Sequence, residues 1–177
     1  MATVPDFADF AGGVLTTTTA NANIRDPGRF LLDRPACQVR QSAAQSIANA
    51  TFVAITFGTE DLDSPAGHHD NVTNNTRFTA QYPGWYQLSG AVAFVANATG
   101  QRITRWAVNG TGLNGGDVFS QTTAANDVVA AARTMLVLLT ANDYVELQAW
   151  QNAGGALNTS NTAGEQPTIT VTWMRRA

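Results

Sequence analysis

The 177-residue sequence predicts an all-β sandwich, and two observations support this prediction. From Cys37 onward, short β-prone segments alternate with clusters of Gly, Asn, Asp and Thr, as in antiparallel sheets. Several of these segments alternate apolar and polar residues with a period of two, which is the period of a half-buried strand. Only 13% of the residues are charged, and Thr and Asn fill many polar positions instead. The length suits one domain, or one domain with an appendage.

Eight segments are predicted as strands because β-branched and aromatic residues are frequent in them. They are residues 36–41, 50–57, 76–80, 84–95, 102–109, 127–139, 143–151 and 168–175. Segment 127–139 is also compatible with a helix. Its β-branched content and the Asn-Asp turn that follows it favour a strand.

The core is predicted from strands in which one face is apolar throughout. The alternation within 84–95, 143–151 and 168–175 places large apolar side chains on a single face of each strand. The residues expected in the core are Tyr86, Leu88, Val92, Phe94, Val145, Leu147 and Val171.

The first 35 residues differ from the rest because they lack a sustained period of either kind. We expect residues 1–35 to form an arm, mostly extended with at most one short Thr-capped helix, and residues 36–177 to form the head. The triplet Asp26-Pro27-Gly28 is predicted to end that helix. Isolated apolar residues favour a docking segment over a frayed terminus. They are Phe7, Phe10, Leu15, Phe30, Leu31 and Leu32.

Composition argues against several classes of protein. The net charge of −3 and the pI near 5.1 provide no electrostatic basis for binding nucleic acid. No run approaches the roughly 20 apolar residues that span a bilayer, and the N-terminus lacks the pattern of a secretion signal.

The single cysteine, Cys37, is expected to be a small buried apolar group rather than a nucleophile. Since no Ser/His/Asp arrangement is recognisable either, we expect no enzyme and no cofactor.

Two groups of residues have metal-ligand side chains, and neither predicts a metal site. His68, His69 and Asp70 are adjacent, and neighbouring side chains of an extended segment point to opposite faces, so a solvated loop is expected. Glu60, Asp61 and Asp63 are weak candidates for Ca²⁺, because oxygen ligands suit that ion. The alternative for these three is a charged loop that keeps a sheet edge soluble.

The four tryptophans allow two interpretations. Strand tryptophans usually lie in a core or an interface, but exposed ones stack on sugars. Trp106 is the candidate for a glycan contact, flanked by Arg102 and Arg105, and an interchain salt bridge is the alternative use of these arginines.

Three stretches carry a family resemblance. RFTAQYPGWYQLSGAVAF (77–94), MLVLLTANDYVELQAW (135–150) and TITVTWMRR (168–176) resemble strands of the complement one-q globular head and tumour necrosis factor superfamily. The resemblance implies a jelly roll of about ten strands that assembles as a homotrimer. Asn142 stands where that family usually has Gly, and Asn tolerates the left-handed geometry of such a turn.

The segment 10–41 resembles the leader of virion proteins from phages of actinobacteria, usually described as minor tail or fibre proteins. This resemblance implies a non-enzymatic virion protein whose trimeric head is displayed on the tail for host attachment. The implied partners are the chain itself, other virion proteins and a bacterial surface glycan. The composition predicts neither nucleic acid nor a membrane as a partner. A capsid decoration or head fibre protein is the alternative, and a jelly-roll glycan hydrolase is a remote one.

Overall fold

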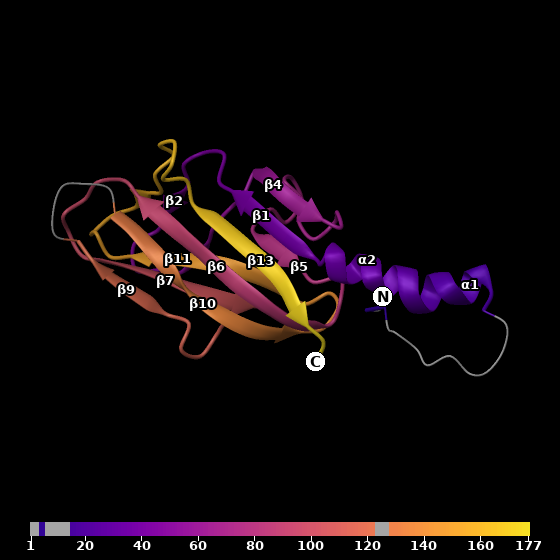
Figure 1. Cartoon of the computed structure of the whole chain (residues 1–177). Helices are drawn as coiled ribbons and strands as arrows, with labels where there is room; N and C mark the ends of the chain where they lie inside the picture. Colours follow the sequence, from indigo (N-terminus) through magenta and orange to yellow (C-terminus); the bar gives the residue numbers. More distant parts are fainter. Residues whose placement is uncertain (1–3, 6–14, 123–127) are drawn as a thin grey trace.

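The protein folds into a sandwich of two antiparallel sheets from which a helical arm projects at one end (Figure 1). A computed structural model describes residues 4–5, 15–122 and 128–177. The predicted fold class, an all-β jelly roll, is confirmed.

The first sheet has five strands in the order β10-β6-β13-β1-β4. In chain order they are β1 (Ala36–Arg40), β4 (Thr59–Ser64), β6 (Gly84–Phe94), β10 (Val128–Leu139) and β13 (Thr168–Arg175). β6 pairs with β10 on one side and with β13 on the other, so the two longest pairings of the sheet meet on it, each with one register shift.

The second sheet has the order β3-β11-β7-β8, with β5 also paired to β11 and β9 to β7. Its strands are β3 (Val53–Ala54), β5 (Arg77–Thr79), β7 (Gln101–Val108), β8 (Thr111–Gly112), β9 (Val118–Gln121) and β11 (Tyr144–Gln151). A separate short pair consists of β2 (Ser46–Ile47) and β12 (Leu157–Asn158).

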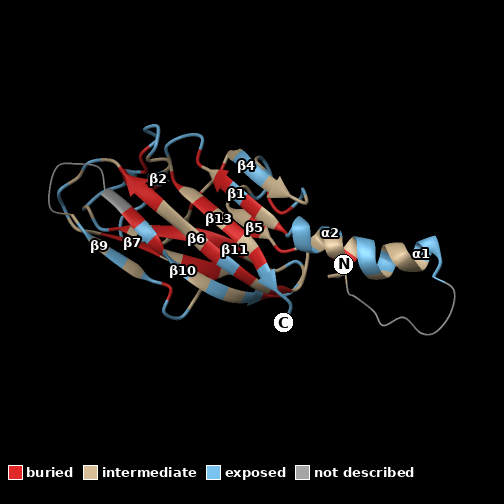
Figure 2. Cartoon of the chain, viewed as in Figure 1, coloured by how far each residue is buried: buried red, intermediate tan, exposed pale blue. Residues whose placement is uncertain are grey.

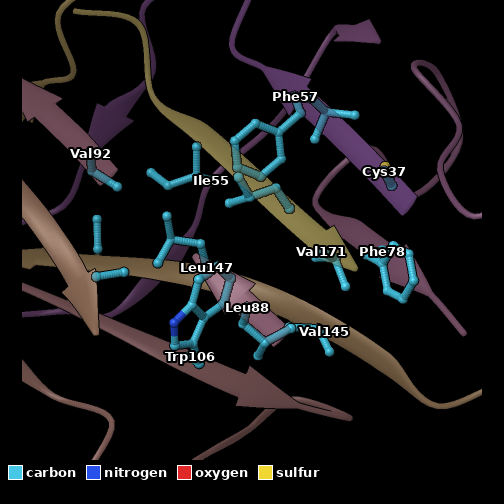
Figure 3. Close-up of a cluster of buried hydrophobic side chains, with 14 of the residues drawn as sticks. Cys37, Ile55, Phe57, Phe78, Leu88, Val92, Trp106, Val145, Leu147 and Val171 are labelled. Atoms are coloured by element: carbon cyan, nitrogen blue, oxygen red, sulfur yellow. The ribbon is translucent and has the colours of Figure 1, made fainter. Parts of the chain in front are cut away.

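The core lies between the sheets and contains every residue predicted for it. Figure 3 shows Leu88, Val92, Val145, Leu147 and Val171 among them. The fully buried members are Tyr86, Leu88, Val92, Phe94, Val145, Leu147 and Val171. Alternation along each strand directs these side chains inward and their neighbours outward. Figure 2 shows the result as buried stretches along β6, β13 and β11, with more exposed residues on β4 and β9.

Each predicted strand segment contains a strand, but the structure adds strands that the sequence did not predict. Of 50–57, only Val53–Ala54 pairs in a ladder.

The acidic segment 59–64, expected to be a loop, forms edge strand β4 beside β1, where Arg40 pairs with Asp61 at 3.0 Å. Charged residues disfavour strands in general, yet they suit an edge because they oppose pairing with another chain.

The arm helix continues through the triplet that was predicted to end it. α1 (Thr17–Ala20), η1 (Asn21–Arg25) and α2 (Asp26–Leu32) follow one another without a break. The expected Thr cap is present, since the Thr16 hydroxyl accepts the Thr19 N–H at 3.1 Å. The N–H of Asp26 donates to the carbonyl of Asn21, and this hydrogen bond closes a wide π-type turn. Pro27 follows in the first turn of α2. The wide turn makes room for the proline ring, so the helix passes the triplet.

The turn between β10 and β11 has the geometry expected for Asn142. Its φ is 76°, in the left-handed region that Asn and Gly tolerate. The Asp143 carboxylate accepts the Thr140 N–H at 2.7 Å and the Asn109 side-chain N–H at 2.8 Å. These hydrogen bonds lower the pKa of Asp143, and the one from Asn109 has the largest effect.

The packing of β6 leads to a stability prediction. Leu88 is fully buried, so Leu88→Ala should lower the free energy of unfolding by about 2–5 kcal/mol, the cost of a large-to-small change in a packed core. Leu62 on β4 is 47% exposed, and Leu62→Ala is the matched control, with an expected change of less than about 1 kcal/mol. Urea denaturation of both variants measures the difference, and equal losses would show that the inward face has been assigned wrongly.

Candidate functional site

Trp106 lies in the core and not on the surface, which corrects its prediction as a glycan contact. Its side chain is fully buried and points between the sheets, near Leu88 and Leu147 (Figure 3). Its indole N–H donates to the carbonyl of Arg133 at 2.7 Å, so its one polar group is satisfied inside the sandwich. Trp106 therefore has a packing role.

Arg102 is also buried, and this corrects its assignment to the same site. Its terminal nitrogens donate to the carbonyls of Thr99, Gln101 and Asn97, each at 3.0 Å. No carboxylate within ion-pair distance balances its charge among the described residues. Its guanidinium instead binds the carbonyls of the segment that leads into β7.

Arg105 points to the opposite face of β7 and lies on the outer face of the second sheet. Its guanidinium carbon is 3.6 Å from the centre of the Phe52 ring, and its Nε donates to Oε1 of Gln148 at 2.8 Å. A Cβ atom at Gly112 would lie 3.1 Å from the same guanidinium, so the glycine leaves room for it. Of the three residues proposed as a glycan contact, Arg105 alone is on this surface.

Three aromatic side chains and one isoleucine form a cross-strand row on that outer face, which we call the aromatic row. β11 pairs with β7 through Trp150 and Ile103, and β7 pairs with β9 through Ile103 and Phe119. Residues directly opposite in antiparallel strands share a face. The ring of Phe52, next to β3, lies 6.4 Å from that of Trp150. Phe119 is 63% exposed, Phe52 and Trp150 are half-buried, and Ile103 between Trp150 and Phe119 is buried.

A second cation lies farther along the same face, and it is neutralised. Arg77 stacks over Tyr144 with its guanidinium carbon 3.9 Å from the ring centre, and its Nε lies 3.3 Å from Glu146. Thr76 also donates to this carboxylate, at 2.9 Å. The Arg77 charge therefore has a local partner, unlike that of Arg105.

The outer face of the first sheet has a different chemistry. Two exposed arginines lie on β10 and β13: Arg133 in the bulge of β10, and Arg175, which pairs with Trp85. We call the uncharged outward side chains of β6, β10 and β13 the apolar sheet face. They are Trp85, Gln87, Ser89, Ala91, Leu136, Leu138, Thr168, Thr170, Thr172 and Met174.

One end of the apolar sheet face is strongly hydrophobic. Leu136, Leu138 and Met174 are 59%, 49% and 38% exposed, and Leu138 lies directly opposite Trp85. A groove of about 410 Å³ runs between Trp85, Leu136, Met174 and Arg175. Monomeric proteins rarely expose a contiguous apolar patch of this kind without a partner for it.

The arm meets the head at the same end of the sandwich. The Phe30 ring of α2 packs edge-on against Tyr82 and Trp173, with centroids 5.1 and 4.9 Å apart. The guanidinium of Arg176 donates to the carbonyls of Val4 and Pro5. These contacts fix the base of the arm helix to the head.

The predicted docking residues therefore occupy different positions. Phe30 contacts the head, whereas Leu15, Leu31 and Leu32 are 55%, 53% and 91% exposed. Phe7 and Phe10 lie outside the described residues.

His68 and His69 are buried, which corrects the prediction of a solvated loop. His68 stacks on Phe78 with ring centroids 4.9 Å apart, and its Nδ1 lies 3.0 Å from the Thr79 carbonyl. Because a carbonyl only accepts, Nδ1 is the protonated nitrogen. The two nitrogens of His69 face the carbonyls of Arg77 and Phe57 at 2.8 and 3.2 Å. Both histidines hold this loop against β5.

The acidic residues upstream do not converge on one point. Asp61 pairs with Arg40, and the Asp63 carboxylate accepts the backbone N–H groups of Gly67, His68 and His69. Glu60 is exposed on β4. Within the part of the chain that the structure describes, no three His, Cys, Asp or Glu side chains gather as metal ligands.

Cys37 is fully buried in β1, as predicted. Burial, reinforced by the nearby charges of Asp63 and Glu60, raises the pKa of its thiol to about 12. The thiolate that acts as a nucleophile is therefore disfavoured at neutral pH. In residues 15–122 and 128–177, no helix is both long and apolar enough to span a bilayer.

Comparison with known proteins supports the fold. No protein-family model and no curated protein sequence matches the chain. The globular domain of zebrafish complement 1qA protein is similar in structure, with a TM-score of 0.60, 14% identity, and coverage of 81% of this chain and 100% of that one. Murine APRIL matches with a TM-score of 0.59, 8% identity and coverage of 79% and 98%. Eiger TNF from S. frugiperda matches at 0.56, with 11% identity and coverage of 81% and 96%.

These similarities define the class of the protein by its fold. The chain is a jelly roll of the complement one-q and tumour necrosis factor type. At such low sequence identity the comparison establishes the fold alone.

The buried His68 leads to a prediction about pH. Burial lowers its pKa below the usual 6.5, against the opposing effects of the Thr79 hydrogen bond and the Asp63 charge. As the pH falls below 6.5, the unfolded chain gains a proton at His68 that the folded chain resists, so the free energy of unfolding should decrease. Above pH 6.5 this contribution is constant.

The variant His68→Phe keeps a ring on Phe78 but cannot titrate. Its free energy of unfolding should therefore fall less steeply between pH 6.5 and pH 5 than that of the parent protein, as measured by urea denaturation at each pH. Parallel curves for the two proteins would refute the assignment.

Proposed function

We propose that this chain is a non-enzymatic virion protein, a homotrimeric head that is displayed on a phage tail and contacts the host surface, while its N-terminal arm joins the particle. The observation that carries the proposal is the apolar sheet face, whose exposed Leu136, Leu138 and Met174 lie beside Arg175 on a fold of the complement one-q and tumour necrosis factor type. The resemblance of the head implies a trimer, and the resemblance of the arm supports a virion.

Self-association is favoured by the energetics of that face. Complete burial of a leucine contributes about 1.5–3 kcal/mol, so Leu136 and Leu138, each about half exposed, would contribute about 1 kcal/mol apiece in every subunit. Trp85 and Met174 add to this, and all contributions are repeated three times in a trimer. The Ser and Thr side chains of the rest of the face carry no charge. Arg133 and Arg175 are the exposed charged residues of β10 and β13, and an interface would have to leave them hydrated or give them partners.

The arm is suited to attachment because its base is fixed and its apolar residues are exposed. Phe30 holds α2 on the head, so the exposed Leu31 and Leu32 are presented in a defined position. A trimer would present three such arms, and multiple linked contacts raise the overall affinity for a particle well above that of one arm.

The alternative within the same class is a capsid decoration or head fibre protein, whose trimer stabilises the shell. A glycan hydrolase is a remote alternative, because Cys37 and His68 are both buried and burial disfavours the thiolate of Cys37. Electron micrographs of particles labelled with an antibody against the head distinguish the two virion locations.

Disruption of the apolar sheet face should abolish the trimer. Leu138→Glu places a charge opposite Trp85, and its desolvation in an interface would outweigh the contacts that remain. Sedimentation equilibrium at micromolar concentration should show a trimer for the parent protein and a monomer for the variant, with unchanged circular dichroism.

Leu62→Glu is the control, because Leu62 has a similar exposure of 47% but lies on edge strand β4, two strands from β13 on the same side of the sheet. This variant should remain trimeric. A monomeric parent protein, or a trimeric Leu138→Glu variant, would contradict the proposed interface.

Loss of the arm should separate assembly of the head from attachment to the particle. Deletion of residues 2–25 together with Leu31→Ser and Leu32→Ser retains Phe30 and its contacts with the head. We expect a folded trimer that no longer incorporates into virions in a complementation assay read by immunoblotting of purified particles. Incorporation at the parental level would mean that the head itself makes the attachment.

A further inference from the structure

We propose that the outer face of the second sheet binds an acidic saccharide, with a carboxylate or phosphate of the ligand at Arg105 and a sugar ring against Trp150. This inference rests on the proposed role in host-surface contact and specifies the face and the chemistry of that contact. It replaces Trp106 and Arg102, which the fold buries, by residues of the aromatic row.

The first argument is that Arg105 is held in place before any ligand arrives. Phe52 covers one face of its guanidinium at 3.6 Å, Gln148 accepts from Nε at 2.8 Å, and Gly112 leaves space beside it. A planar guanidinium fixed in this way loses little conformational freedom on binding, and it offers a fork that matches a carboxylate or a phosphate.

The second argument is that the charge of Arg105 is not neutralised. The ion pairs among the described residues are Arg25–Asp26, Arg40–Asp61 and Arg77–Glu146, and none of them involves Arg105. Within residues 15–122 and 128–177, no acceptor is found for its two terminal nitrogens, which distinguishes Arg105 from Arg102. A fixed cation with free N–H groups is complementary to an anionic group.

The third argument is that the adjoining surface suits a sugar. The aromatic row crosses β3, β11, β7 and β9, and three strand spacings of about 4.8 Å give it a length of roughly 14 Å. That length accommodates a short oligosaccharide. Aromatic rings offer apolar faces to the C–H surface of a pyranose, and Trp150 and Phe119 are accessible to it.

Nucleic acid fits this face less well. The chain has a net charge of −3, and the Arg77 cation on the same face is already paired with Glu146, so the surface does not offer the several phosphate contacts that nucleic-acid binding requires. One charged group on a largely neutral sugar matches one free cation beside apolar rings.

The test measures binding of the full chain to three probes by isothermal titration calorimetry. These are hexagalacturonate, which carries carboxylates, a teichoic-acid-type poly(glycerol phosphate), which carries phosphates, and neutral maltohexaose. We expect at least one anionic probe to bind and maltohexaose to bind at least about tenfold more weakly, because the charge-assisted contact is missing. Comparison of the two anionic probes shows whether a carboxylate or a phosphate is preferred.

Two substitutions locate the site. Arg105→Gln should weaken binding of the anionic probe by about ten- to a hundredfold, and Arg105→Lys should restore only part of it, because a lysine lacks the planar fork. Trp150→Ala should also weaken binding by about tenfold, and Trp150→Phe, which keeps a ring, controls for a packing defect. Arg29→Gln on α2 removes the same charge far from the row and should bind as the parent protein does.

The proposal is overturned if neither anionic probe binds, if maltohexaose binds equally well, or if Arg105→Gln binds like the parent protein. Sedimentation of the same samples separates this outcome from failure of the proposed function. A trimer without saccharide binding would contradict the ligand site only, whereas a monomer would contradict the trimeric head.

Discussion

The structure depends on the two-residue alternation along β6, which is hydrogen-bonded to a neighbour on each side. Because successive side chains point to opposite faces, the same strand places Tyr86, Leu88, Val92 and Phe94 in the core and leaves Trp85 outside. A shift of its register by one residue would exchange the two sets. The inner set holds the two sheets together, and the outer set, together with β10 and β13, forms the apolar sheet face. Stability of the single chain and its proposed assembly therefore have a common origin.

The two outer faces of the sandwich differ in a way that separates their proposed roles. The first sheet presents exposed leucines together with Thr and Ser side chains, whose hydroxyls cost less to desolvate than a charged group and can hydrogen-bond across an interface. The second sheet presents Arg105 and Arg77, each stacked on an aromatic ring, beside the exposed Phe119. A surface of the first kind suits association with other copies of the chain, whereas a surface with a fixed, unneutralised cation suits a small anionic ligand. The arm emerges near the apolar end of the first face, where Phe30 packs on Trp173.

The fold was largely predictable because its signals are local. The core residues of β6, β11 and β13 follow from alternation within single segments, and each was placed correctly. The β7 segment was harder, because RITRWAV has apolar and basic residues on both faces, so its sequence did not show that Trp106 points inward and Arg105 outward. The aromatic row was missed because Phe52 and Phe119 meet their neighbours only through cross-strand register. His68 and His69 were misplaced for a similar reason, since the carbonyls that satisfy their buried rings belong to other segments of the chain.

The central claim is that the apolar sheet face is covered by other copies of the chain. Hydroxyl-radical footprinting with mass spectrometry tests it directly, because the oxidation rate of a side chain, corrected for the intrinsic reactivity of that residue type, follows its exposure to water. The full chain at micromolar concentration should show Met174, Leu136 and Leu138 strongly protected relative to their exposed fractions of 38%, 59% and 49% in the single chain, while Phe119 and Val72, 63% and 87% exposed, are oxidised freely. Oxidation of Met174, Leu136 and Leu138 in proportion to those fractions would show that the face is open to water and would contradict the account.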